Sequence, residues 1–543
     1  MILNMKKIVL SIFTLAFAIN INAQTEKPKL VIGIVVDQMK QEYLWRYEND
    51  FGNGGFKRLM NQGFEAKNAH YNYSNTSTGP GHASVYTGTT PSIHGIVNNS
   101  WYSKVLKRSV YCAEDTTAQA VGGTEDDGHI SPANLYSSTI TDELKMSTQQ
   151  LGKVIAMSIK DRGSALPGGH LSDGSYWYNA ATGTFMTSTY YMESLPQWVQ
   201  DFNNRKLADQ YLNMTWELAK PASDYTESGE DNSKHESGFR GKSSPTFPYD
   251  LKELRGQNGN FGMLPSTPWG NTILTEMALA AIDAEGLGSD AIPDFLAVSY
   301  SSTDYVGHNF GPQSREVQDM YIRLDKELER LLNELDKKVG KGNYVVFLSA
   351  DHAVAENSQR MNELGYRYNN FNSRGLANHL GEAIHEKYGE GDWVENAGLD
   401  LFLNHATLKT KGIDLYEMQL FIAQKAMEYP GVYLAIPGID LTRNSYDQHI
   451  AKLVQNAYHP KENGDVKMVL DPGWQGGGMR GTGHGTPWTY DTHIPVLFYG
   501  WGVKPGKSVR EIHITDIAPT VSMLLNIRLP SGATGTPIFE LMK

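Results

Sequence analysis

The chain has 543 residues, of which 40% are hydrophobic and 20% are charged, and its formal net charge at pH 7 is −12. This composition is typical of a globular protein and excludes a disordered or fibrous chain. The acidic balance argues against nucleic acid as a partner, because binding a polyanion requires a basic face.

The N-terminus has the layout of an export signal. Lys6 and Lys7 precede an apolar run from Ile8 to Ile19, and Ala23 offers a small residue for cleavage. The run is shorter than the roughly 20 residues of a membrane-spanning helix. We therefore expect a signal peptide at residues 1–23 and a periplasmic or secreted mature protein; a buried N-terminal helix is the alternative. No later apolar run predicts a membrane anchor.

The first predicted strand ends at an acidic residue. Residues 29–37 read KLVIGIVVD, a nearly continuous β-branched run that is typical of a buried parallel strand. Asp37 stands at its carboxyl end. Ligands bind at this edge of open α/β sheets, so Asp37 is a candidate functional residue.

A polar segment at residues 74–88 contains candidate nucleophiles. Pro80 and the residues from Ala83 onward predict the start of a helix. A hydroxyl there would meet the positive end of the helix dipole and free N–H groups, which favour an alkoxide and a phosphate anion. Thr78 and its neighbour Ser77 are the two candidates, and an ordinary helix cap is the alternative role.

Two further strands and a helix form a predicted β-α-β unit. The strands are residues 294–300 and 343–349. Between them, residues 313–338 carry apolar side chains at the three-and-four spacing of an amphipathic helix. We expect Gly307, just after the first strand, to permit a turn that directs neighbouring side chains inward.

Aspartates and histidines gather after these strands, and one histidine follows later between two glycines. Zinc prefers imidazole nitrogen and carboxylate oxygen, and paired metals can stabilise both oxygens of an in-line displacement at phosphorus. Each motif alone is more often structural, but their joint placement at strand ends predicts ligands for two metals. The first group is Asp304, His308 and His484, and the second group is Asp37, Asp351 and His352.

The remaining chain supplies a last strand, a covering helix and two long polar stretches. Residues 493–499 predict the strand and residues 515–525 the helix. Residues 165–285 and 360–460 are rich in Gly, Asn, Ser, Tyr and Trp, and we interpret them as insertions. We expect one catalytic domain over residues 24–543.

Seven ordered motifs carry a resemblance that spans nearly the whole mature chain. They are VVD37QM, ST78GPGHA, GIVN98N99, IK160DR162G, STD304YVGH308, AD351H352 and GTGH484G. With them the chain resembles the alkaline phosphatase superfamily and, within it, the PafA-type bacterial phosphate monoesterases. The resemblance implies an α/β fold with a central, mostly parallel sheet flanked by helices and with inserted segments forming a cap.

The resemblance also implies roles for the two groups. It assigns one zinc ion to the first group and a second to the second group together with the Thr78 oxygen, and it implies a covalent phosphothreonine intermediate. Thr78 is chosen over Ser77 because it directly precedes Gly79 and Pro80, as in the family.

Three more residues correspond to the family's phosphate-contacting groups: Asn99, Lys160 and Arg162. Their chemistry agrees, since a monoester dianion carries charge that Lys, Arg and an amide can hold. We expect Lys160 and Arg162 on an extended segment, with both side chains on one face; two surface cations are the alternative. The predicted activity is hydrolysis of small phosphate monoesters.

Other functions stay open at this stage. A phosphodiesterase or nucleotide pyrophosphatase would share the metal site, and an inactive homologue would bind phosphate without turnover. A sulfatase is disfavoured, because no Cys/Ser-x-Pro-x-Arg signature is present and the single cysteine, Cys112, lies elsewhere. Cys112 is expected to be a buried or neutral thiol, and His82, His94 and His170 to be structural or surface histidines. The sequence leaves the natural ester, the metal identity and the oligomeric state open, with a monomer as the working expectation.

Overall fold

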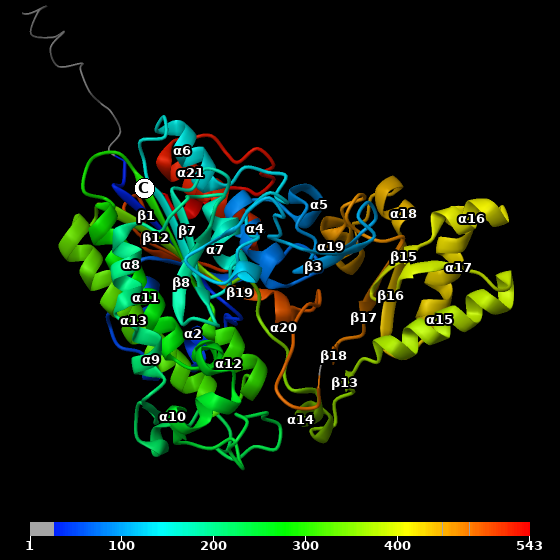
Figure 1. Ribbon diagram of the computed structural model, residues 1–543, viewed down its shortest axis with the longest axis horizontal. Helices are drawn as coiled ribbons and strands as arrows, with labels where there is room; N and C mark the ends of the chain where they lie inside the picture. The colour runs from blue at the N-terminus through cyan, green and yellow to red at the C-terminus, as the bar shows by residue number, and fades with distance from the viewer. Residues whose placement is uncertain (1–26, 448, 477, 543) are drawn as a thin grey trace, which may run out of the picture.

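A computed structural model describes residues 27–447, 449–476 and 478–542, so the expected signal peptide at 1–23 lies outside the described residues. A sheet of 11 strands runs through the larger part of these residues (Figure 1). We call this larger part the body. A smaller part, residues 369–475, projects to one side and is called the lobe.

Five parallel strands form the middle of the main sheet. In order they are β12 (Tyr344–Ser349), β1 (Leu30–Val36), β11 (Asp294–Tyr300), β6 (Val154–Ser158) and β7 (Gly174–Asn179). Every residue of β1 is buried, because helices cover both faces of the sheet. The parallel order brings the carboxyl ends of all five strands to one edge.

Antiparallel strands occur on both sides of the parallel centre. The expected strand at 493–499 is β19 (His493–Gly500), which pairs antiparallel with β12 and with β2 (Phe64–His70). On the other side, β8 (Thr184–Ser188) pairs antiparallel with β7. The sheet is therefore mostly parallel, as predicted.

Two groups of helices cover the sheet (Figure 1). One group contains α11 (Trp269–Glu285) and α13 (Arg315–Leu335), the helix expected at 313–338. The other contains α4 (Thr78–Thr87), α7 (Arg162–Gly168) and α21 (Ile517–Leu525), which is the covering helix expected at 515–525. The helix α4 therefore starts at the same edge where the parallel strands end.

Residues 165–285 are not separate from the main sheet. They contribute β7 and β8 to it, and α11 packs on it. The aromatic sequence of β7, GSYWYN, forms a buried strand despite its Gly and Asn residues. The extent of the insertion expected here thus needs correction, and what remains outside the sheet is mainly the short helices and the hairpin of β9 (Thr215–Trp216) and β10 (Tyr249–Asp250).

The lobe has a sheet and a hydrophobic core of its own. Its strands are, in order, β14 (Val394–Asn396), β15 (Asp400–Leu403), β17 (Val466–Leu470) and β16 (Val432–Pro437). The helices α15 (Ser373–Tyr388), α16 (His405–Lys411) and α17 (Leu415–Met427) accompany them. Leu376, Ile422 and Met468 belong to a buried cluster distinct from the core of the body.

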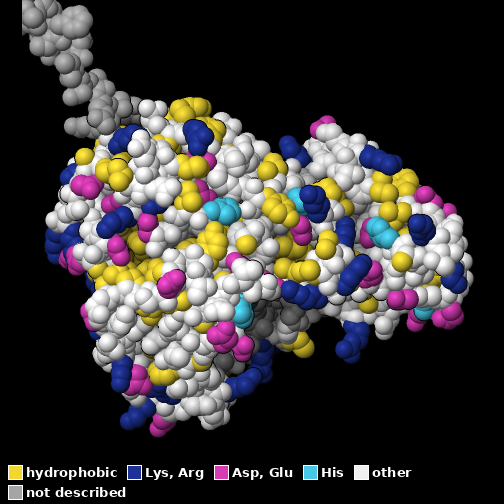
Figure 2. All heavy atoms as spheres, turned by 45° about the horizontal axis from the view of Figure 1, so that its top comes forward, with side chains coloured by type: hydrophobic (Ala, Val, Ile, Leu, Met, Phe, Trp, Pro, Cys, Tyr) yellow, Lys and Arg dark blue, Asp and Glu magenta, His cyan; other side chains and the backbone are white. Residues whose placement is uncertain are grey.

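The visible surface mixes both signs of charge. Figure 2 shows Lys and Arg interspersed with Asp and Glu over the face turned to the viewer. Among the described residues, none of the helices combines the length and apolar character that crossing a membrane requires.

Candidate active site

Four parallel strands deliver the candidate residues to one edge of the sheet. Asp37 follows β1 directly, Lys160 follows β6, Asp304 follows β11, and Asp351 follows β12. In the register of the sheet, Val35 lies opposite both Ser299 and Ser349, so these strands end at similar heights. Residues far apart in sequence meet here for that reason.

Asp304 and His308 lie on a helix, which corrects the expected turn at Gly307. Both belong to α12 (Ser302–Phe310), where a spacing of four residues places side chains on one face. Gly307 is needed for a different reason. A Cβ built there would lie 1.8 Å from Gln38 Oε1, so a larger residue would displace the Gln38 side-chain amide.

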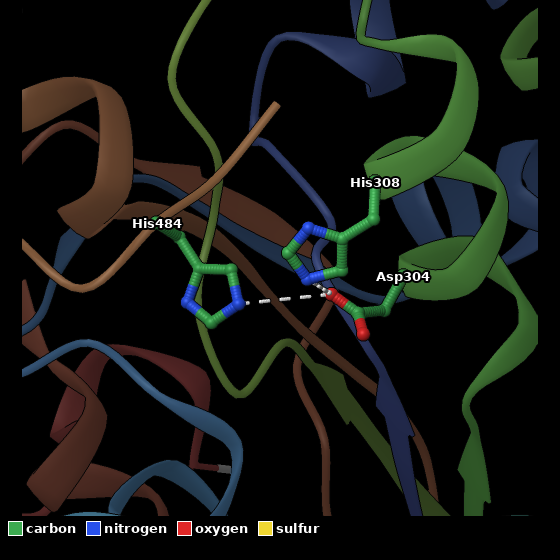
Figure 3. Close-up of side chains that lie close together, drawn as sticks. All are labelled: Asp304, His308 and His484. Carbon is green, nitrogen blue, oxygen red and sulfur yellow. Dashed lines mark ion pairs between the residues drawn. The ribbon is translucent and has the colours of Figure 1, made fainter. Parts of the chain in front are cut away.

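The first group converges on one carboxylate oxygen (Figure 3). The distance from Asp304 Oδ1 is 3.1 Å to His308 Nε2 and 3.8 Å to His484 Nε2. The two histidines come from different elements, α12 and the loop before β19, and both rings point to Asp304. These distances suit three ligands of one cation.

The three histidines of the two groups share a hydrogen-bonding pattern. Each ring uses Nδ1 to reach a backbone carbonyl oxygen, which fixes the ring and leaves Nε2 to offer its lone pair, as metal-binding histidines do. The pairs are His308 with Thr482 at 2.8 Å, His484 with Thr76 at 2.7 Å and His352 with Ala353 at 2.9 Å.

The second group is completely buried. Asp37, Asp351 and His352 have no exposed surface. Within the part of the chain that the structure describes, Asp37 Oδ1, Asp351 Oδ2 and His352 Nε2 have no hydrogen-bond partner, although unpaired buried polar atoms are costly. His352 Nε2 lies 3.3 Å from Asp37 Oδ1 and 3.7 Å from Asp351 Oδ2. A divalent cation would satisfy all three atoms, and this donor set of nitrogen and oxygen fits zinc.

Asp304 belongs to both groups geometrically. Besides its place in the first group, one of its oxygens lies within 4.8 Å of ligand atoms of Asp37 and His352. The expected separation into two independent trios is therefore incomplete, because a shared carboxylate lies between them. This placement suits two neighbouring cations.

The pKa values of these groups depend on positive charge nearby. Burial and Asp304 would raise the pKa of Asp37, but Lys160 and His352 hold it well below its ordinary value. Burial, together with Asp37, raises the pKa of Asp351 well above its ordinary value. Burial lowers the pKa of His352, yet Asp351 and Asp37 raise it to about 9. The positively charged side chains nearby thus keep the pKa of Asp37 low, but they do not keep the pKa of Asp351 low.

Thr78 is the first residue of α4 and is almost fully buried, with 1% of its surface exposed. Its hydroxyl oxygen lies 3.4 Å from Lys160 Nζ and 3.5 Å from Arg162 Nη2. Ser77 holds the N-cap position instead, and its hydroxyl donates to Asn98 Oδ1 at 3.3 Å. The two candidate hydroxyls therefore have different surroundings, and the one near both cations is that of Thr78.

Lys160 and Arg162 are not on an extended segment, which corrects that expectation. The strand β6 ends at Ser158, and Asp161 caps the helix α7, of which Arg162 is the first residue. The prediction failed because the apolar run of β6 gives no signal for where a helix begins. Both side chains still reach Thr78, since the chain turns there.

Lys160 is central to the charge arrangement of the site. Its Nζ lies 2.6 Å from Asp37 Oδ2 and 2.6 Å from Asp304 Oδ2, so it links the two groups. Burial opposes its charge, but Asp304 and Asp37 raise its pKa above the ordinary value. Lys160 is therefore a permanent cation beside Thr78.

Asn99 is held at the start of α4 by its side chain. Its Oδ1 accepts the Gly79 N–H at 2.7 Å, which turns its amide nitrogen away from that bond. Arg162 is oriented by Tyr111, whose hydroxyl accepts its Nη1 at 3.1 Å. Asn99, Lys160 and Arg162 thus lie around the start of α4, and the sequence did not identify Tyr111.

Gln38 is a second residue that sequence reasoning missed. Its Nε2 donates to Asp304 Oδ1 at 2.6 Å, and its backbone N–H donates to Asp351 Oδ1 at 3.2 Å. Its φ of 65° lies in the left-handed region, which a glutamine rarely adopts. The only sequence signal was its place directly after Asp37. Gln38 holds one carboxylate of each group.

The three histidines outside the predicted ligand groups have different surroundings. His82 is buried, and its Nε2 lies 2.8 Å from Ser299 Oγ. Its Nδ1 lies 2.9 Å from the Thr78 carbonyl oxygen and 3.5 Å from Asp351 Oδ2, so His82 adjoins the candidate site. His94 is buried beside Ser84 Oγ at 2.9 Å, and His170 pairs with Asp142 Oδ2 at 3.0 Å. Burial raises the pKa of the Cys112 thiol to about 12, so it is neutral.

Comparison with known proteins adds independent information. Residues 31–493 match the model of the type I phosphodiesterase / nucleotide pyrophosphatase family. The chain is 43% identical to alkaline phosphatase PafA of Elizabethkingia meningoseptica, over 95% of each chain. It is also 43% identical to alkaline phosphatase PhoV of Synechococcus elongatus, over 95% of this chain and 93% of PhoV. The crystal structure of wild-type PafA superposes with a TM-score of 0.92 at 42% identity, covering 96% of this chain and all of that one.

Proposed function

From the premise that the chain belongs to the type I phosphodiesterase / nucleotide pyrophosphatase family and, within it, to the PafA-type alkaline phosphatases, we propose that it hydrolyses small phosphate monoesters through Thr78 with two zinc ions. It is a phosphatase, and the products would be inorganic phosphate and an alcohol.

One observation carries the proposal. The Thr78 hydroxyl lies at the start of α4 with Lys160 and Arg162 both within 3.5 Å, near two buried carboxylates and one imidazole that each have an atom without a hydrogen-bond partner among the described residues. A hydroxyl, two fixed cations and metal-ligand atoms at one sheet edge are the parts that phosphoryl transfer to a side chain requires.

The two groups of ligands would hold the metals. Asp304, His308 and His484 would bind one ion, and Asp37, Asp351, His352 and the Thr78 oxygen the other. When bound, the ions lower the pKa of the attacking oxygens and stabilise the charge on the leaving ones.

The chain itself positions and stabilises the reacting groups. Thr78 Oγ attacks phosphorus and releases its hydroxyl proton to solvent, a new Oγ–P bond forms, and the bond to the alcohol oxygen breaks, so the alcohol leaves with a proton from solvent. Water then cleaves the phosphothreonine, releases phosphate and restores the Thr78 hydroxyl. Lys160 and Arg162 stay charged throughout and offset the negative charge of the phosphoryl oxygens.

The same cations support a monoester over a diester. A monoester dianion carries one more negative charge than a diester, and Arg162 and Lys160 would meet that charge, with the Asn99 amide as a further donor. The rival is a phosphodiesterase or nucleotide pyrophosphatase, because the matched family carries that name. A phosphate-binding homologue without turnover is disfavoured, because every candidate catalytic and metal-ligand position has the residue type that the family motifs require.

We extend the proposal to the whole chain. Residues 1–23 would direct export to the periplasm or beyond and then be removed, and residues 24–543 would form one catalytic domain with the lobe as its main insertion. All candidate site residues come from one chain, so a monomer would suffice.

The test is a side-by-side assay on purified, zinc-loaded protein whose metal content is measured. We expect rapid hydrolysis of p-nitrophenyl phosphate, slow hydrolysis of the bis-nitrophenyl diester and of the sulfate ester, and about two zinc ions per chain. A strong preference for the diester would contradict the monoesterase proposal. Activity that survives complete removal of the metal would contradict the zinc proposal.

A further inference from the structure

A cleft opens beside the first group, between the body and the lobe. Its volume of about 360 Å³ lies within the range of small-molecule sites. His484 and Thr486 line one end of it, together with Asn98, the neighbour of Asn99. The cleft is therefore continuous with the candidate active site.

The position of the cleft matches the side on which an alcohol would leave. An in-line displacement places the attacking and leaving oxygens on opposite sides of phosphorus. Under the proposed function the Thr78 oxygen belongs with the second group, so the alcohol leaves on the side of the first group. His484 is a member of that group and lines the cleft.

Aromatic rings from both parts of the molecule form one wall. Tyr102 comes from β3 (Ser100–Ser103) of the body, and Phe402 comes from β15 of the lobe. The rings of Tyr102 and Phe402 meet edge to face, with 5.2 Å between centroids. Figure 2 shows hydrophobic side chains gathered at this junction. The neighbouring Trp101 packs in a buried cluster of the body, and its Nε1 donates to Glu462 Oε2 of the lobe at 2.9 Å, which links β3 to the lobe.

The rest of the lining mixes apolar residues such as Leu399 and Val469 with polar ones, and it carries no net charge. Asp400 and Lys467 are the charged residues among those that line the cleft, and they pair with each other at 3.1 Å. The remaining polar lining consists of amides and hydroxyls such as Asn98, Asn396 and Gln475. Such a lining offers hydrogen bonds to hydroxyl groups and no unpaired charge for a second ionic group.

We infer that this cleft binds the alcohol part of the substrate and that this part is a neutral ring bearing hydroxyl groups, as in a sugar phosphate or a nucleoside monophosphate. The inference rests on the proposed function. An aromatic wall suits the face of a ring, and amides and hydroxyls suit its hydroxyl groups. A small alkyl phosphate would leave these contacts unused.

The test compares three esters on the zinc-loaded enzyme: glucose 6-phosphate, AMP and methyl phosphate. We expect at least one of the two ring esters to exceed methyl phosphate in kcat/KM by about 10-fold or more, which is the scale of selectivity that a few contacts provide. A larger gain for glucose 6-phosphate identifies a sugar site, and a larger gain for AMP a nucleoside site.

Two variants change the cleft in opposite ways. Tyr102→Ala removes part of the aromatic wall. Gly398→Trp adds bulk, since Gly398 lines the cleft and a Cβ there would meet only Asp400 backbone atoms, at 3.8 Å or more. Both should abolish the preference for the ring ester while kcat/KM for methyl phosphate and inhibition by inorganic phosphate stay within about 2-fold of wild type.

Tyr366→Ala is the matched control, because it removes an exposed tyrosine ring that does not line this cleft. It should keep the preference. Equal kcat/KM for all three esters in the wild type, or a preference that survives both Tyr102→Ala and Gly398→Trp, would overturn the inference while the proposed function stands. If the wild type turns over none of the three esters, the proposed function fails and this inference fails with it.

Discussion

The two groups of candidate ligands differ in their contact with solvent. The second group is fully buried, and Asp37, Asp351 and His352 all have 0% exposure. In the first group, the side chain of His308 is 40% exposed and that of His484 is 11% exposed. Both groups use the same residue types, so the difference lies in where the sheet and helices place them.

This difference assigns separate tasks to the two groups. The buried group adjoins the candidate nucleophile and excludes water from it, which strengthens electrostatic interactions there. The more open group borders the cleft, where under the proposed function the alcohol would leave and water would enter. The predictions below test this division, and the largest expected effect comes first.

Thr78→Ala should reduce kcat/KM for p-nitrophenyl phosphate by on the order of 10⁴-fold or more, because no other side chain replaces the nucleophile. Ser77→Ala is the control, since the neighbouring hydroxyl points to Asn98. Steady-state kinetics of both variants show which of the two hydroxyls is the nucleophile. The reverse order of effects would move the nucleophile to Ser77.

His352→Ala and His308→Ala form a matched pair across the two groups. With chelator present, His352→Ala should lower the free energy of unfolding by about 3–5 kcal/mol, because Asp37 and Asp351 lose a buried partner. His308→Ala should lower it by less than about 1 kcal/mol, since solvent reaches that side chain. Chemical denaturation measures both values.

Metal content gives the second readout of this pair. Each variant should lose about one of the two zinc ions per chain. Equal destabilisation by the two substitutions would contradict the difference drawn between the groups.

Lys160→Ala and Arg162→Ala should each lower kcat/KM for a monoester by about 10²–10³-fold, because each removes a fixed cation from the phosphoryl oxygens. The kcat/KM for the diester should fall much less, so the ratio of kcat/KM for the monoester to that for the diester becomes smaller. Lys153→Ala is the control, because it removes a partly exposed lysine just before β6, the strand that precedes Lys160. It should change kcat/KM for neither the monoester nor the diester. Unchanged monoester kinetics in the first two variants would remove the basis for the substrate class.

Gln38→Gly should lower metal affinity by about 10–100-fold, since Gln38 orients Asp304 and such supporting residues act at that scale. Glycine accepts the left-handed backbone, so the N–H bond to Asp351 is kept and only the side chain is lost. Zinc titration against a competing chelator measures this. Gln41→Ala, a nearby buried glutamine, serves as the control.

The smallest expected effect concerns Glu316, a buried carboxylate with no ion-pair partner among the described residues. Burial, with Asp231 and Asp319 adding to it, raises the pKa of Glu316 from 4.5 to about 8. The folded protein then binds a proton that the unfolded chain has released, so stability falls as pH rises from about 4.5 to about 8. Asp37 has the opposite shift, because Lys160 and His352 compensate for its burial.

Glu316→Gln should therefore flatten the decline of the melting temperature between pH 5 and pH 8. Scanning calorimetry of wild type and variant, both zinc-loaded, measures the two slopes. Identical slopes would show that Glu316 is ionised in the folded protein.

Much of the fold followed from local patterns. The β-branched runs at 29–37 and 343–349 predicted buried parallel strands, and the three-and-four spacing at 313–338 predicted α13, because burial on a sheet demands those patterns. Residues 165–285 were misjudged, since Gly, Asn and Tyr in β7 resemble a loop until neighbouring strands cover them.

The sequence by itself determined the candidate ligand types and the positions of Asp37, Asp304 and Asp351 shortly after strands, because an acidic residue after an apolar run is a local feature. Only the tertiary structure decided that Asp304 lies between both groups, that Gln38 joins them and that Lys160 reaches two carboxylates. These contacts join residues more than 100 positions apart, and they depend on strand register and helix packing, which no local pattern encodes.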